Sequence, residues 1–279
     1  MRADGRKLKN VDALYRVVPH IMVHRHDSMN MTTINLPIAP MQKYIRKKAG
    51  EGITVTHMGI ILAAYMRTLA EFPALNRFIS NRKAYAHKEV TVSMVVLKAN
   101  STENETMSKI HLDVNDTIFS VQNKIDSYIT DNRKHTTQNS TDKMVDILLR
   151  IPGLLRVGIA IFKWLDKHGW LPKAITDLSP FHASLLITNL ASIRTNHIYH
   201  HVYDFGTTSI SMALGTLREV PRRTATGEIV FDRCIPVGLV MDERIASGVY
   251  FAKAFRVFKR YIKNPEILEN PPEIVNEDK

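Results

Sequence analysis

The chain has 279 residues, 44% of them apolar, and a formal net charge of +11. A chain of this length can bury a substantial core and can still form one domain. The most apolar region, residues 144–165, is interrupted by charged residues, proline and glycine, so no membrane-spanning helix is expected. Basic motifs interleaved with aromatic residues, and zinc-type spacings, are missing. The positive charge therefore favours small anionic ligands over nucleic acid.

Two features favour a reducing, cytoplasmic location. The N-terminal residues contain no apolar core of the kind found in signal peptides, and Cys234 is the single cysteine, which excludes an internal disulfide. Cys234 falls in an apolar stretch and is interpreted as a small buried residue rather than a nucleophile. The basic, apolar residues 144–169 favour a core or subunit-contact helix over contact with a membrane surface.

The first half of the chain predicts alternating helices and strands. Residues 1–28 are interpreted as a basic N-terminal arm, loosely held or packed on a neighbour over its first ten residues, with a short helical or irregular segment at 12–26. Thr56 is the expected N-cap of a long helix that ends before Pro73. The other expected elements are a strand at 29–39, a helix at 41–49, a hairpin turning at 80–82, a strand at 89–97, a short strand at 111–114 and a helix from 118.

The second half predicts a loop at 136–141, helix over 144–169 with a break at Pro152-Gly153, and a strand within 179–190 that ends in a polar turn. Two long strands, 207–217 and 228–240, joined through 221–227, precede an amphipathic helix at 249–263. Residues 266–279 are expected to fray, and 273–279 are interpreted as an acidic tail. Helices and strands mix without strict alternation. An α+β fold with a mixed sheet covered by helices is therefore predicted.

The end of the last expected strand is the most informative stretch. An apolar run delivers Asp242, Glu243 and Arg244 to a turn, and Ser247-Gly248 opens the last helix. A buried strand that ends in polar residues beside a helix start is an arrangement that presents a reactive side chain.

These residues resemble the catalytic domain of the 2-oxoacid dehydrogenase acyltransferases and their relatives, the chloramphenicol acetyltransferases. That family carries an Asp/His-His-x-x-x-Asp-Gly signature at this place. Asp242 and Gly248 match it, whereas Glu243 stands at the position of the catalytic histidine and Ser247 at that of the second aspartate. Weaker matches are Pro73-Ala-Leu-Asn76, Thr188-Asn189-Leu190 with Ala191 in place of the usual glycine, and Asn264-Pro265.

The resemblance implies a chloramphenicol acetyltransferase-like α+β domain over residues 29–272, assembled as a homotrimer with its sites at subunit interfaces. It further implies coenzyme A or acyl-coenzyme A as the ligand, with no metal. By position, the Thr188 hydroxyl would donate to the oxyanion and Glu243 would occupy the place of the base. The residues implied to support the site are Arg25, Asn189, Asp242, Ser247 and Gly248.

The glutamate changes the expected chemistry. Proton transfer from a thiol of pKa near 8.5 to a carboxylate of ordinary pKa near 4.3 is uphill by roughly four units, unless burial raises the pKa of the carboxyl group. Loss of a positioned base typically costs about 10²- to 10⁴-fold in rate. We therefore expect a weak coenzyme A-dependent acyltransferase. The alternative is a catalytically inactive homologue, a pseudoenzyme that acts as a trimeric binding or assembly protein.

The serine has a consequence for Arg25. In the family, the aspartate at the Ser247 position pairs with an arginine near the N-terminus, and Arg25 is the best candidate for that arginine. Because serine cannot form the ion pair, we hypothesise that Glu243 pairs with Arg25 instead. Such a pair would lower the pKa of the glutamate and make it a poorer base.

The twelve histidines allow other interpretations. Two clusters stand out, one formed by His24 and His26 and the other by His197, His200 and His201. Neither has a carboxylate nearby at ligand spacing, so ordinary hydrogen-bonded histidines are favoured over a metal site. The second cluster could line an acyl or coenzyme channel because it follows the Thr188 turn. Asp204 with His200 or His201 and Ser209 forms a triad on paper, which their positions on one short segment disfavour.

Overall fold

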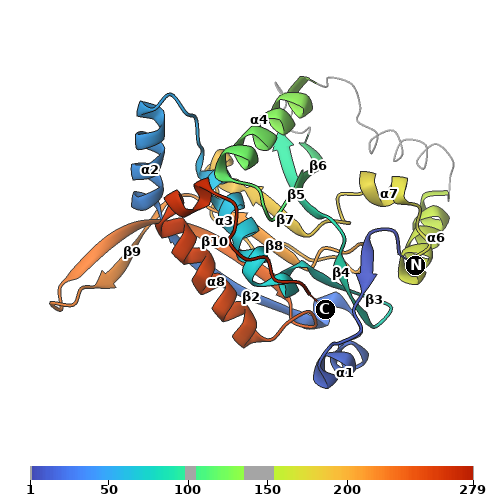
Figure 1. The fold of residues 1–279 in the computed structure, drawn as a ribbon. Helices are drawn as coiled ribbons and strands as arrows, with labels where there is room; N and C mark the ends of the chain where they lie inside the picture. Colours follow the sequence, from blue (N-terminus) through green and yellow to red (C-terminus); the bar gives the residue numbers. More distant parts are fainter. Residues whose placement is uncertain (1, 98–104, 135–153, 279) are drawn as a thin grey trace.

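A computed structural model describes residues 2–97, 105–134 and 154–278 (Figure 1). The loop expected at 136–141 and the helix break expected at Pro152-Gly153 lie outside the described residues. No helix within the described ranges is long and apolar enough to cross a membrane.

The described chain is organised around a mixed sheet of seven strands. Its order is β2-β10-β8-β7-β5-β6, with β9 joined to the outer part of β10. β7 runs parallel to both β5 and β8, whereas the other neighbours are antiparallel. The strands are β2 (Met29–Pro37), β5 (Val90–Leu97), β6 (Glu105–Leu112), β7 (Leu185–Asn189), β8 (Ile210–Leu214), β9 (Arg218–Arg223) and β10 (Ile229–Asp242).

One face of this sheet is covered by helices, with α3 and α8 across its middle and α4 over β5 and β6 (Figure 1). Helix α3 is buried along almost its whole length, and its N-cap is Thr56, whose hydroxyl accepts from Gly59 N at 3.1 Å, as predicted. The helices are α1 (Ala13–Ile21), α2 (Ile38–Gly50), α3 (His57–Glu71), α4 (Ile118–Lys134), α6 (Leu154–His168), α7 (Lys173–Leu178) and α8 (Gly248–Lys263). Short 3-10 turns occur at η1 (Arg25–Ser28), η2 (Pro73–Asn76), η3 (Leu190–Ile193) and η4 (Pro265–Glu269). The prediction of an α+β fold with a helix-covered mixed sheet is confirmed.

The N-terminal residues are not a loose arm. A second sheet, of order β1-β4-β3, joins β1 (Gly5–Lys7) to the hairpin of β3 (Arg77–Ser80) and β4 (Lys83–His87). Arg2 is 5% exposed and forms ion pairs with Asp4 and Asp166. A buried guanidinium needs such partners, so this contact ties residue 2 to α6. The expectation of a loosely held start is wrong.

The C-terminal end is also held. Asn276 N donates to Ala70 O at 2.8 Å, and the Asp278 carboxylate pairs with Arg77. Fraying was expected because the tail is rich in glutamate and proline. These contacts to α3 and β3 explain why that expectation is wrong.

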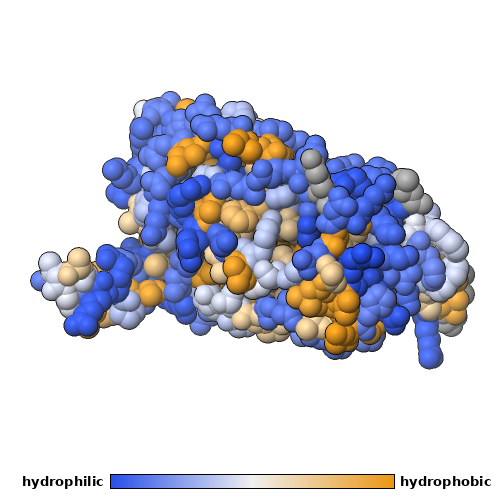
Figure 2. Space-filling view, turned by 60° about the horizontal axis from the view of Figure 1, so that its bottom comes forward, coloured by the Kyte–Doolittle hydropathy of each residue, from blue (hydrophilic) through white to orange (hydrophobic). Residues whose placement is uncertain are grey.

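Strand boundaries differ from the sequence-based expectation around residues 207–228. The strand expected at 207–217 is confined to β8, and part of the expected connection forms β9, which pairs with the start of β10. The resulting hairpin projects from the body at the left of Figure 1, and its tip is mostly hydrophilic in Figure 2. A run with few apolar residues can still form a strand when a long partner supplies the backbone hydrogen bonds.

Candidate active site

The end of β10 is a buried charge network. Asp242 is fully buried, and its carboxylate accepts from Arg244 Nη2 at 2.7 Å, from Arg244 Nε at 2.9 Å and from the Ser28 hydroxyl at 2.9 Å. Arg25 Nε lies 3.5 Å from the same carboxylate. Two buried guanidiniums therefore share one counter-charge. Removing that carboxylate would leave both positive charges buried and unpaired, which would destabilise the fold.

The hypothesised ion pair between Arg25 and Glu243 is wrong. Among the described residues, the carboxylate near the Arg25 guanidinium is that of Asp242, and the guanidinium also donates to the carbonyl oxygens of Tyr203 and Gly206. Asp242 takes the role because its side chain points into the buried interior with the arginine. The Glu243 carboxylate instead accepts from Asn30 Nδ2 at 2.8 Å, and Asn30 is exposed.

Ser247 caps the last helix. Its hydroxyl accepts from Tyr250 N at 3.1 Å, and Gly248 is the first residue of α8. A serine N-cap satisfies a backbone N–H that the helix itself leaves without a partner. Ser247 therefore has a local structural role as a helix cap.

A cavity of about 450 Å³ opens beside Glu243, between α8 and the paired strands β2 and β10. Asn30, the partner of Glu243, lines it, as do Arg256 and Lys259. Burial lowers the pKa of Lys259, and the charge of Lys263 adds to this effect. The floor is apolar, with Ile34, Leu239, Met241, Phe251 and Phe255 among its residues. An apolar floor with cations at its edge suits an acyl chain attached to an anionic carrier.

The end of β7 brings a hydroxyl and an imidazole together. Thr188 is 6% exposed, and its Oγ1 lies 2.8 Å from Nε2 of His200, which is half-buried. Burial lowers the pKa of His200 below its ordinary value of 6.5, and the charge of His201 adds to this effect. The imidazole is therefore neutral near pH 7, the state in which a ring nitrogen can accept a proton. Asn189, which follows Thr188, is exposed.

The loop that carries His200 is fixed onto the sheet face opposite the helices. Thr33 Oγ1 lies 3.0 Å from His197 Nε2, close to where Ile198 crosses β10 at Gly238. A Cβ added at Gly238 would come within 2.1 Å of Ile198 O, so only glycine lets the loop lie this close. The fold thus sets the position of His200 through its neighbours on both sides.

Thr188 and Glu243 do not meet within one chain. Thr188 pairs with Ala213 of β8, and Ala213 pairs with Gly238 of β10. Glu243 comes after the end of β10, beyond that point. With a strand spacing of about 4.8 Å and a rise of about 3.3 Å per residue, the two Cα atoms are roughly 19 Å apart.

The two side chains also belong to opposite faces of the sheet. Ile187 is in the core beneath the helices, so its neighbour Thr188 faces the other side. Asn30 shares the face of Ile34, which is in the helix-covered core, and Glu243 bonds to Asn30. A reaction that used both Thr188 and Glu243 would require two subunits.

The structure also decides the remaining candidates for chemistry, namely the cysteine, the triad and the histidine cluster. Cys234 is buried, and burial raises the pKa of its thiol, as expected for a packing residue. The triad on paper does not form: the buried Ser209 hydroxyl has no hydrogen-bond partner within the described part of the chain, and Asp204 contacts His24 at 3.0 Å. That last contact also overturns the premise that His24 and His26 lack a carboxylate. The pairing of His200 with Thr188 had one sequence signal, its position after the Thr188 turn.

Comparison with known proteins gives a likeness in structure only. No protein-family model matches the chain, and no curated protein matches it. Solved structures do match. A probable dihydrolipoamide acetyltransferase from Listeria monocytogenes superposes with a TM-score of 0.57 at 14% identity, over 92% of this chain and 94% of that one. Dihydrolipoamide acetyltransferase from Azotobacter vinelandii gives 0.60 at 11% identity, over 94% of each chain.

A chloramphenicol acetyltransferase gives a TM-score of 0.55 at 11% identity, over 95% of this chain and 99% of that one. The chain has the chloramphenicol acetyltransferase fold. The likeness runs over nearly the whole of both chains.

Proposed function

We propose that the chain is an acyltransferase that moves an acyl group from a coenzyme A thioester to a thiol, hydroxyl or amine acceptor. The observation that carries the proposal is the contact of 2.8 Å between Thr188 Oγ1 and His200 Nε2. It is supported by the fold shared with acyltransferases. A hydroxyl beside a neutral imidazole is the pair that acyl transfer needs.

In the proposed reaction, His200 Nε2 takes the proton of the acceptor as the acceptor atom attacks the thioester carbonyl. The C–S bond then breaks, and the coenzyme A thiolate leaves with the proton that the imidazolium returns. The Thr188 hydroxyl, released from the imidazole, donates a hydrogen bond to the oxyanion of the tetrahedral intermediate. Each proton and electron pair is thereby accounted for within the two residues and the two substrates.

Glu243 is a second candidate base, which the resemblance implies. It could reach a Thr188 only in another subunit, because the two lie roughly 19 Å apart in one chain. A trimer is proposed on the same resemblance. The apolar side chains of Ile229 and Phe231, 68% and 62% exposed on the projecting hairpin, support contact with another copy.

The test is a coupled assay of purified protein with acetyl-coenzyme A and a panel of thiol, amine and hydroxyl acceptors, with free thiol release as the readout. We expect His200→Ala to lower kcat/KM by about 10²- to 10⁴-fold, as typical for loss of a general base. His201→Ala is the matched control, because His201 is the exposed neighbour on the same loop. A large loss of kcat/KM in Glu243→Gln, with little change in His200→Ala, would identify Glu243 as the base instead.

The inactive binding protein is the second candidate, and it is favoured by the carboxylate at the position of the family's catalytic histidine. It predicts binding of coenzyme A in calorimetry with no turnover of any acceptor. Turnover gained only in the double variant Glu243→His with Ser247→Asp would support it, and wild-type turnover would exclude it.

A further inference from the structure

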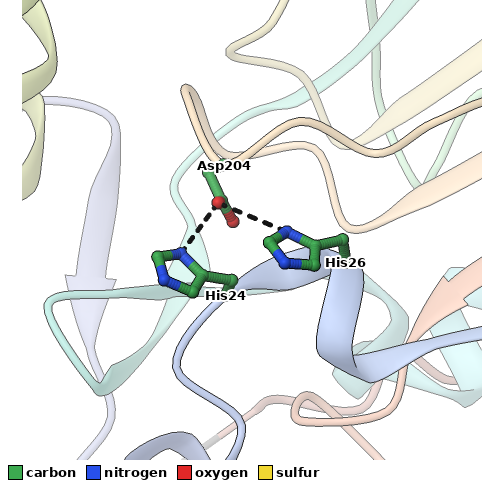
Figure 3. A group of neighbouring side chains, drawn as sticks. All are labelled: His24, His26 and Asp204. Carbon is green, nitrogen blue, oxygen red and sulfur yellow. Dashed lines mark hydrogen bonds and ion pairs between the residues drawn. The ribbon is translucent and has the colours of Figure 1, made fainter.

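We propose that His24, His26 and Asp204 form a binding site for a divalent transition metal ion such as Zn²⁺, independent of the proposed acyl transfer. Figure 3 shows both imidazoles directed toward the Asp204 carboxylate, which descends from another part of the chain. Each of the three residues offers one ligand atom, and these atoms all lie within 4.8 Å of one another.

The spacing of the ligand atoms fits one metal ion. Asp204 Oδ2 lies 3.0 Å from Nδ1 of His24 and 3.8 Å from Nδ1 of His26. Ligands about 2.0 to 2.1 Å from a tetrahedral Zn²⁺ are about 3.3 to 3.4 Å apart. The His24 and His26 rings are stacked 10° from parallel, so one or both would rotate to point a nitrogen at the shared ion. Two imidazoles with one carboxylate suit Zn²⁺ and its first-row neighbours, whereas Mg²⁺ and Ca²⁺ prefer oxygen ligands alone.

Asp27 contacts both histidines and helps to orient their ligand atoms. His26 Nε2 lies 3.2 Å from Asp27 Oδ1, an ion-pair contact, and Nδ1 faces Asp204. The other Asp27 oxygen accepts from His24 N at 3.1 Å. A carboxylate behind a histidine is the arrangement that fixes the tautomer of metal-binding imidazoles.

Asp204 is held in the same way. Its Oδ1 accepts from Arg25 N at 2.5 Å, which leaves Oδ2 turned toward the two imidazoles. The backbone therefore sets the direction of the carboxylate without using its second oxygen. At 3.8 Å, the His26 nitrogen and Asp204 Oδ2 are too far apart for a hydrogen bond, and a shared ion explains why they still face each other.

The electrostatic surroundings permit a cation. Asp27 and Asp204 together supply two negative charges against the ion. Both nearby buried guanidiniums, Arg25 and Arg244, pair with Asp242, which offsets one of their two positive charges. The His24, His26 and Asp204 side chains are 58%, 64% and 45% exposed, so an ion in solution can reach them and water can complete its coordination.

The ion would join two segments that are distant in sequence. His24 and His26 flank Arg25 at η1, whereas Asp204 belongs to the loop that also carries His200. A bound metal would hold this loop against η1, and a ligand that binds only the folded state raises its stability. The site thus has a readout, thermal stability, that does not depend on catalysis.

The experiment is calorimetric titration of the untagged, chelator-treated chain with Zn²⁺, together with its melting temperature with and without Zn²⁺. We expect one ion per chain and a higher melting temperature with the metal. Because loss of even outer-shell partners weakens metal binding by about 10- to 100-fold, His24→Ala, His26→Ala and Asp204→Asn should each weaken it by at least about tenfold. Asp204→Asn keeps an oxygen that can accept from Arg25 N, so the loop contact is retained.

His111→Ala is the matched control. His111 is an exposed histidine with a carboxylate 3.3 Å away, Glu89, and it belongs to no three-residue cluster within the described residues. It should leave the affinity and the thermal shift unchanged. Co²⁺ should show the intense visible bands of tetrahedral coordination in wild type and in His111→Ala, and in none of the three ligand variants. Absence of binding up to about 1 mM Zn²⁺, or equal weakening in His111→Ala, would overturn the proposal.

Discussion

At the end of β10, Asp242 is fully buried and is shared by two guanidiniums, whereas at the end of β7 the Thr188 hydroxyl meets a single imidazole from a half-buried loop. The first arrangement is fixed by several mutual contacts, and any change of charge there disturbs the fold. The second keeps a neutral ring nitrogen beside one hydroxyl. Breaking a buried charge network is costly, whereas an imidazole with a lowered pKa is available for chemistry.

The comparison also separates neighbouring residues at the β10 end. Asp242 and Glu243 are adjacent in sequence, yet one completes a buried network and the other bonds an exposed asparagine beside a cavity. The position of a carboxylate at a strand end therefore does not predict its role. The environment decides that role, and it differs completely between these two.

The largest expected effect breaks the buried network. Asp242→Asn leaves the Arg25 and Arg244 guanidiniums without their shared counter-charge, so the free energy of unfolding should fall by about 3 to 5 kcal/mol. Glu243→Gln is the matched control and should change it by less than about 0.5 kcal/mol. Urea denaturation followed by circular dichroism measures both. Equal losses in the two variants would remove the distinction between these carboxylates.

The pH dependence of activity sharpens the assignment at the β7 end. His200 must be neutral to accept a proton, and its pKa is lowered from 6.5 by burial and by His201. As pH falls, kcat/KM should therefore stay level through 6.5 and then drop about tenfold per pH unit once below the lowered pKa. A profile of rate against pH from 4 to 9 checks this. If kcat/KM already declines above pH 7, a His200 with a lowered pKa is not the base.

The helix cap tests whether Ser247 is structural. Ser247→Ala removes the acceptor for Tyr250 N and should lower the free energy of unfolding by about 1 kcal/mol. Ser247→Asp should restore it, because aspartate caps equally well. Both should leave kcat/KM unchanged, as measured by free thiol release. A gain of activity in Ser247→Asp alone would show that this position still serves the chemistry.

The smallest expected effect is that mixing two slow variants restores no activity. Thr188 and His200 lie in contact within one chain, so mixed assemblies of Thr188→Ala and His200→Ala subunits should stay as slow as either variant alone. If the two residues worked across the subunits of a trimer, each trimer that contains both variants would keep one of its three sites intact. Co-expression with two different tags and assay of the doubly purified complex distinguishes these outcomes.

By itself, the sequence determined most of the architecture. Thr56 capping α3, the apolar stripe of α8 and the polar end of β10 are local patterns with one structural solution each. They suffice for the α+β fold because periodicity and capping act over only a few residues. Strand β9 escaped because its sequence lacks the apolar alternation of a strand, although its partner β10 follows it directly in the chain. The anchored chain ends escaped because their contacts come from partners far along the chain.

Only the tertiary structure decided which side chains meet. Arg25 was expected to pair with Glu243, but its partner is Asp242, because the buried guanidinium lies beside the buried carboxylate and not beside the more exposed Glu243. The contact of His200 with Thr188, and that of Asp204 with His24, join residues whose sequence spacing carries no periodic signal. Such contacts depend on how the loop over 194–209 crosses the sheet, and that path is set by long-range packing, including the space left by Gly238.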